Sequence, residues 1–139
     1  MKTLRNLLVS KPTAEVFSPF FGKKFERFCR KEFIPRLFPD YNQIGRWWHK
    51  DKEIDIVGIN KEQETILFIE CKWNELQRRD VASVLQDLKR KANSVQWNNK
   101  TRTEIHGIIG KKIREKKSLK QKGVLLFDLR DIMQEDKEH

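Results

Sequence analysis

The residues of this chain best suited to chemistry are two acids and a lysine at the ends of two apolar runs. Asp55 lies within the run 54–59, and Glu70 and Lys72 come directly after the run 66–69. Carboxylate oxygens are the ligands that Mg²⁺ and Mn²⁺ prefer in proteins. A lysine beside such an ion can orient a water molecule and offset charge on a phosphoryl oxygen. These residues therefore predict metal-assisted cleavage of a phosphodiester bond, with Mg²⁺ (or Mn²⁺) as the cofactor.

The two apolar runs favour a β-hairpin that would bring the acids together. Both runs are rich in β-branched residues, and a short polar segment separates them. We take Asn60 to pair with Thr65 across a four-residue turn. Counting back along both strands then places Asp55 opposite Glu70. The predicted metal ligands would thus come from neighbouring strands.

The same register predicts roles for three neighbouring residues. Glu53 would lie opposite Lys72 on the same face, which makes Glu53 a candidate additional carboxylate. The backbone carbonyl of Cys71 is a candidate further ligand, whereas its thiol would point to the opposite, packed face. Because strand side chains alternate, a slip of one residue would turn Asp55 away from the site.

Several stretches of the chain resemble a known family. Asp55 followed by Glu70-Cys71-Lys72 is similar to the PD-(D/E)XK signature of nucleases with the restriction-endonuclease-like fold, although Ile54 stands where that signature has proline. The likeness is closer to an uncharacterised domain at the C-terminus of archaeal ATPases and extends from about Phe20 to Asp128. It rests on the stretches 21–26, 45–48, 53–57 and 68–73.

The resemblance implies a fold, an activity and further site residues. It implies a restriction-endonuclease-like core in which Asp55 and Glu70 hold the metal ion, Lys72 positions the attacking water and Glu26 in the first helix assists the metal. Relatives of this kind carry a nucleotide-binding domain upstream. The chain would then be a free-standing relative or one domain of a longer protein, with an ATPase domain or subunit as a partner.

The order of expected elements predicts an α/β fold with a central mixed β-sheet flanked by helices. A first helix has an aromatic stripe and ends at Pro35, and a second, capped by Asp80, has an apolar stripe. The two stripes are Phe21, Phe25, Phe28, Cys29 and Phe33, and Val81, Val84, Leu85, Leu88 and Ala92. The expected strands are 44–48, 54–59, 65–69, 104–109 and 123–128, with 73–79 as a loop. The expected divisions are an arm at 1–19, a nuclease-like domain at 20–132 and an acidic tail at 133–139.

The charge balance favours a polyanionic partner. The 139 residues include 30 Lys and Arg against 20 Asp and Glu, a formal net charge of +10. Lysines that neutralise phosphates add affinity for nucleic acid, so we expect DNA as the substrate. Gln86 and Lys89 are candidates for supporting the site, although a solvated helix face is the default for both. The candidate DNA contacts are Lys89, Arg90, Lys91, Lys111, Lys112, Arg114, Lys116 and Lys117.

The remaining features indicate the cellular compartment and leave one alternative function open. Two cysteines without metal-ligand spacing fit a reducing cytoplasm, and no apolar stretch is long enough to span a bilayer. The sequence leaves a homodimer open. The rival to a nuclease is a catalytically idle module that binds nucleic acid or an ATPase partner, with the acids serving as an ion pair to Lys72.

Overall fold

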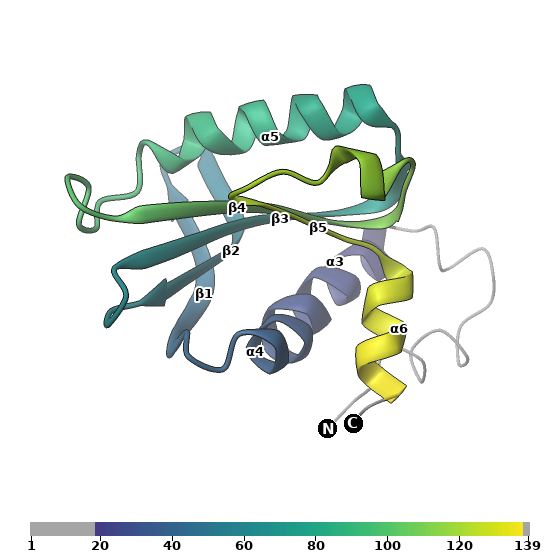
Figure 1. The fold of residues 1–139 in the computed structure, drawn as a ribbon, viewed down its shortest axis with the longest axis horizontal. Coiled ribbons are helices and arrows are strands. Elements are labelled where there is room, and N and C mark those ends of the chain that lie inside the picture. The colour runs from purple at the N-terminus through teal and green to yellow at the C-terminus, as the bar shows by residue number, and fades with distance from the viewer. Residues whose placement is uncertain (1–18, 138–139) are drawn as a thin grey trace.

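A computed structural model describes residues 19–137 of the chain. Its centre is one five-stranded sheet in the order β1-β2-β3-β4-β5, with helices on both faces (Figure 1). The strands are β1 (Gln43–His49), β2 (Lys52–Asn60), β3 (Thr65–Leu76), β4 (Thr103–Ile113) and β5 (Val124–Phe127). The helices are α3 (Pro19–Phe28), a π-helical segment (Cys29–Phe33), α4 (Ile34–Leu37), α5 (Arg78–Ala92), a 3₁₀ segment (Lys116–Leu119) and α6 (Leu129–Lys137).

The sheet is mixed, which confirms the predicted fold class. β2 runs antiparallel to its neighbours β1 and β3, whereas β4 pairs with β3 in parallel and β5 pairs with β4 in parallel. Asn60 pairs with Thr65, and the β2–β3 ladder extends from there to the pair Ile56 and Ile69. The hairpin register predicted from the two apolar runs is therefore confirmed over these residues.

One face of the sheet is covered by α3, the π-helical segment, α4 and α6, which lie together in Figure 1. Phe25 and Phe33 from this layer pack with Leu67 and Ile69 of β3 in one buried cluster. The aromatic stripe is therefore core, as expected. The prediction that Pro35 ends the helix is wrong, because helical backbone continues to Leu37. Pro35 stands in the first turn of α4, where a missing amide donor costs little.

The opposite face is covered by α5, which lies across the sheet in Figure 1. Its predicted apolar stripe faces the strands, with Leu88 packed against Phe68 in one cluster and Leu85 packed against Ile108 in another. The predicted cap is displaced by three residues. Gln77 is the N-cap, and Asp80 is the N3 residue of a capping box with it.

Three predicted boundaries differ in the structure. The segment predicted as a loop is largely strand, because β3 continues to Leu76 by pairing with Ile113 at the end of β4. Lys111 and Lys112 consequently lie in β4 and not in a connector. Residues 133–137 of the predicted tail form the second half of α6, so the expected domain boundary falls inside a helix. The predicted arm lies outside the described residues except for Pro19, which begins α3.

The pairing of β1 with β2 contains an irregularity that changes which side chains share a face. Gly45 pairs with Val57, but Trp47 pairs with Ile54, so β2 has one extra residue between these pairs. Ile54 accordingly packs on the α5 side of the sheet, whereas Ile56 packs on the α3 side. Strict alternation along β2 fails at this bulge.

The C-terminal end of α5 is held by an arginine that lies outside the helix. The Arg102 side chain is 3% exposed. Its guanidinium donates hydrogen bonds to the backbone oxygens of Ala92, Val95 and Trp97 at 2.7–3.0 Å. Its Nε donates to Glu104 at 2.8 Å. A single side chain thus adds a donor to the last carbonyl of α5 and ties the segment that follows the helix to it.

A buried histidine on β4 predicts a dependence of stability on pH. His106 stacks on Phe68 with ring centroids 5.6 Å apart, and burial lowers the pKa of His106 below 6.5. The unfolded chain therefore binds a proton more readily, so the free energy of unfolding falls as pH drops through about 6.5. We expect His106→Leu to lose less stability than the wild type between about pH 7.5 and about pH 5.5 in chemical unfolding. Equal losses in the two proteins would contradict this assignment.

No helix in the part of the chain that the structure describes combines the length and the apolar character needed to cross a membrane.

Candidate active site

Asp55 and Glu70 stand at the end of the β2–β3 ladder. The last pair of the ladder is Ile56 with Ile69, and the two acids are the next residues along their strands. Asp55 Oδ2 accepts a hydrogen bond of 2.8 Å from the amide of Cys71, which brings the carboxylate across to β3 beside Glu70. Burial, and after it repulsion from Asp55, raises the pKa of Glu70 to about 7. The two carboxylates predicted to meet are thus close enough to repel each other.

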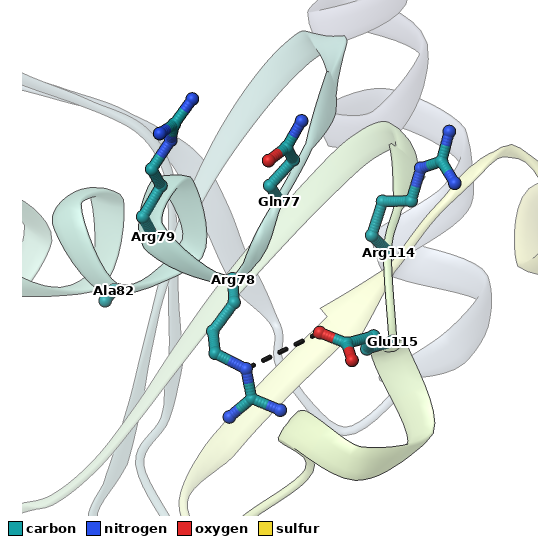
Figure 2. A pocket seen from close by; sticks show the side chains of 6 residues that line it. All are labelled: Gln77, Arg78, Arg79, Ala82, Arg114 and Glu115. Carbon is teal, nitrogen blue, oxygen red and sulfur yellow. Dashed lines mark ion pairs between the residues drawn. The ribbon is translucent and has the colours of Figure 1, made fainter.

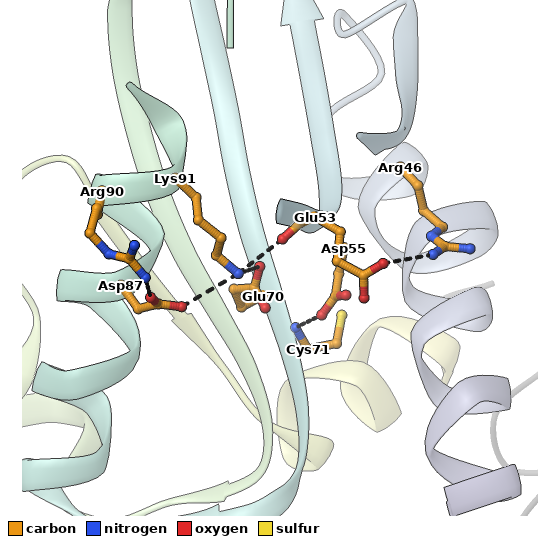
Figure 3. A network of polar contacts seen from close by, with 8 residues as sticks. All are labelled: Arg46, Glu53, Asp55, Glu70, Cys71, Asp87, Arg90 and Lys91. Carbon is orange, nitrogen blue, oxygen red and sulfur yellow. Dashed lines mark hydrogen bonds and ion pairs between the residues drawn. The ribbon is translucent and has the colours of Figure 1, made fainter. Parts of the chain in front are cut away.

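Glu70 also has a partner that approaches from α5 (Figure 3). Lys91 Nζ lies 3.1 Å from Glu70 Oε1 and donates a hydrogen bond of 2.9 Å to the backbone oxygen of Glu53. Asp87 Oδ2, one helical turn earlier, lies 3.5 Å from the same ammonium group. Burial alone lowers the pKa of Lys91, but the attraction of Glu70 raises it overall. Lys91, a predicted DNA contact, thus pairs with an acid of the candidate site.

Glu26 approaches the same region from α3, on the other side of the sheet. Its Oε1 accepts a hydrogen bond of 3.0 Å from Arg30 and lies 3.8 Å from Arg46 Nε. Burial, and after it the negative charge of Asp55, raises the pKa of Glu26. Arg46 also donates to Glu53 Oε2 at 3.2 Å. Glu26 is therefore in electrostatic reach of Asp55, with its charge balanced by two arginines.

Lys72 lies near Glu70 but not opposite Glu53. Its positive charge acts on Glu70, tending to lower the pKa of that acid, and it lines a pocket of about 530 Å³ with Asp80 and Ser83 of α5. Glu53 pairs across strands with Trp48 of β1, and its carboxylate bonds to Arg46. The β2–β3 ladder ends at the pair Ile56 and Ile69, so the predicted Glu53–Lys72 pair is not part of it.

The structure brings together part of the predicted cage. Within residues 19–137, no three histidine, cysteine, aspartate or glutamate side chains gather closely enough to hold a metal ion as they stand. Asp55 and Glu70 provide two carboxylates, which with water is a usual protein contribution to a Mg²⁺ site. The Cys71 thiol packs in the core as predicted, in the cluster that contains Cys29. The donor set of the two acids therefore fits Mg²⁺ or Mn²⁺.

The predicted nucleic-acid contacts divide into engaged and exposed residues. Four pair with acids: Arg90 with Asp87, Lys91 with Glu70, Arg114 with Glu75, and Lys116 with Asp128 and Asp131. Lys111 Nζ lies 5.6 Å from the ring centroid of Trp73. The exposed members are Lys89, Lys112 and Lys117, and Gln86 is exposed on the same helix as Lys89.

A basic surface lies where α5 begins (Figure 2). Arg78, Arg79 and Arg114 line a pocket of about 710 Å³ together with Gln77, Ala82 and Glu115. Arg78 Nε lies 3.5 Å from Glu115 Oε2. The sequence prediction missed Arg78 and Arg79 because this stretch was assigned to a loop. The signal that could have found them is an arginine pair directly before an amphipathic helix.

Sequence reasoning also missed Arg46 and Asp87 at the candidate site. Both act on predicted acids or on the partners of those acids, Arg46 on Glu26 and Asp87 on Lys91. The spacing of Asp87 and Lys91, four residues apart on a helix, was a visible signal for one of these contacts. The contacts of Arg46 cross the β1–β2 bulge, and no local sequence pattern indicates such a bulge.

The fold and the site define an α/β domain with a mixed sheet and an acid pair on adjacent strands. The family model described as "Archaea bacterial proteins of unknown function" (DUF234) matches residues 3–84, and the chain belongs to this family. An uncharacterized protein of Methanocaldococcus jannaschii, MJECL04, is 36% identical over 122 residues, which are 84% of this chain and 26% of that protein. The chain thus spans about a quarter of the length of this relative.

One solved structure is also similar to the chain. It is described as the crystal structure of a repair endonuclease from Pyrococcus abyssi, and it matches with a TM-score of 0.43 and 15% sequence identity. The match covers 73% of this chain and 46% of that chain.

Proposed function

We propose that this domain is a Mg²⁺-dependent nuclease, with a restriction-endonuclease-like core and a PD-(D/E)XK site, that hydrolyses phosphodiester bonds in DNA. The observation that carries the proposal is the placement of Asp55 and Glu70. The two carboxylates belong to adjacent strands, and the pKa of Glu70 is raised to about 7 by burial and, after it, by the negative charge of Asp55. Such a pair is disfavoured without a cation and is suited to hold one.

Each residue of the site has a role in this proposal. Asp55 and Glu70 would hold the ion, which when bound would polarise the scissile phosphate and lower the pKa of a water molecule. Lys72 would orient that water and offset charge on the phosphoryl oxygens. Glu26 would assist from α3 after release from its arginine partners, and the Cys71 amide keeps Asp55 directed toward Glu70.

Charge supports nucleic acid as the substrate class. The net charge of +10 favours a polyanion. The exposed residues Lys89, Lys112 and Lys117, together with the arginine-lined pocket at the start of α5, supply cations that a phosphate backbone could contact. We further propose that the domain acts in the cytoplasm and with an ATPase domain or subunit.

One observation favours a second candidate, a module that binds nucleic acid or an ATPase partner without cutting. Lys91 already neutralises Glu70, at 3.1 Å and with both side chains largely buried. An internal ammonium group can stabilise the acid pair without any metal ion. In this alternative the acids serve the fold, and the basic surfaces serve binding.

A cleavage assay separates the two candidates. We expect the purified protein to cut DNA in Mg²⁺ or Mn²⁺ and to stop when EDTA removes the metal, because metal-ion catalysis needs the cation itself. Both single-stranded and double-stranded substrates are needed, since charge alone does not choose between them. DNA binding without cleavage of any substrate in either metal would exclude the nuclease function and favour the binding module.

A further inference from the structure

Trp48 stands out on the surface of the protein. Its side chain is 69% exposed, and among the described residues it is the large hydrophobic residue that stands exposed. Its neighbour Trp47 packs against the buried cluster under α5. Consecutive tryptophans of one strand thus serve opposite purposes, since one contributes to the core and the other presents its indole to solvent.

The surroundings of Trp48 combine aromatic and cationic groups. The guanidinium of Arg46 lies 6.0 Å from the centroid of the Trp48 ring. Trp48, Trp47, His49 and Lys50 line a pocket of about 690 Å³ between the β1–β2 turn and the end of α5. Asp51 is the acid among the lining residues. An exposed indole beside cations is the arrangement on which proteins stack unpaired nucleobases above a solvated phosphate backbone.

The position of Trp48 connects it to the candidate active site. Trp48 pairs with Glu53 across strands, and Arg46 reaches both Glu53 and Glu26. Asp55 is two residues from Glu53, a separation of about 7 Å along a strand. A strand with a base stacked on Trp48 could therefore pass close to Asp55.

We propose that Trp48 is a stacking site for an unpaired base, so that the domain engages nucleic acid at a single-stranded segment or end. The inference rests on the proposed nuclease function and names the substrate form that this site takes. An intact duplex keeps its bases stacked on each other and presents only their edges, whereas an unpaired base offers a free aromatic face.

Binding measured without metal tests this proposal separately from cleavage. In EDTA, fluorescence anisotropy with a labelled single-stranded oligonucleotide should give Trp48→Ala an affinity about 5- to 150-fold below that of the wild type. Trp48→Phe, which keeps an aromatic face, should stay within about threefold of the wild type, and so should Trp48→Ala on a blunt duplex of the same sequence. Because the side chain is exposed, the substitutions should leave unfolding transitions unchanged.

The outcomes distinguish this site from other uses of the surface. Equal losses on single strand and duplex, or no loss on either, would overturn the stacking site. A shift from dimer to monomer on Trp48→Ala in sedimentation would also overturn it, and would assign the indole to contact with a second copy of the chain. Trp48-dependent binding by a protein that cleaves no DNA would instead exclude the nuclease function and support the stacking site.

Discussion

Replacing Asp55 with asparagine is expected to lower metal-dependent cleavage of DNA by at least about 100-fold, the order seen when one electrostatic group of an active site is removed. Asparagine keeps an oxygen that can accept the hydrogen bond from the Cys71 amide, so the hairpin should keep its geometry. What it loses is the negative charge that would hold the cation. Glu70→Gln should have an effect of similar size, because Glu70 is the second proposed ligand. Initial rates of DNA cleavage in Mg²⁺ measure the effects of both substitutions.

A matched control makes this result specific. Glu62→Gln changes an exposed acid in the turn between β2 and β3, and its rate should equal that of the wild type. DNA binding in EDTA should persist or strengthen in Asp55→Asn, since the substitution removes a charge that repels phosphates. Cleavage by Asp55→Asn and Glu70→Gln at the wild-type rate would assign the activity to a contaminant or another site and would refute the proposed one.

The second large effect concerns stability and one arginine. Arg102→Ala is expected to reduce the free energy of unfolding by about 3 kcal/mol, the order found when one partner of a largely buried charged network is removed. The substitution leaves Glu104 without its guanidinium partner and removes one donor from each of three backbone oxygens at and beyond the end of α5. Unfolding in urea, followed by circular dichroism, gives this difference directly.

Arg102→Lys is the informative control for this prediction. Lysine keeps the charge, but its single ammonium group cannot reproduce the planar set of donors that reaches carbonyls in several directions. We therefore expect Arg102→Lys to lose more than half of the stability lost by Arg102→Ala. Full stability in the lysine variant would show that charge alone matters here. A loss below about 1 kcal/mol in Arg102→Ala would contradict the capping role.

The sequence predicted the parts of the fold that depend on local pattern. β-Branched runs and a polar turn were sufficient to give the register that starts at Asn60 and Thr65, because hairpin partners are close in the chain. Apolar spacing gave the buried faces of α3 and α5 for the same reason. The end of β3 at Leu76 could not be predicted in this way, because its partner Ile113 is supplied by a distant parallel strand.

The candidate site was predictable only in outline. The placement of Asp55 and Glu70 at the end of the β2–β3 ladder followed from the hairpin register, but the contact of Glu53 with Arg46 across the bulge in β2 did not. A bulge adds a residue without a clear mark in composition. Lys91, the partner of Glu70, was also missed, because it belongs to a basic run of α5 that is typical of a solvated helix face. Its direction is fixed by how the helix crosses the sheet, which is a tertiary property.

The mixed sheet divides the chain into two regions with different loop-closure entropies. β1, β2 and β3 are joined by short turns, whereas β4 pairs with β3 only after the chain has traversed α5. Closing a short loop restricts fewer chain conformations than closing a long one. Asp55 and Glu70 belong to the short-loop region, so their approach needs little conformational restriction of the rest of the chain. Lys91 joins them only through the longer closure.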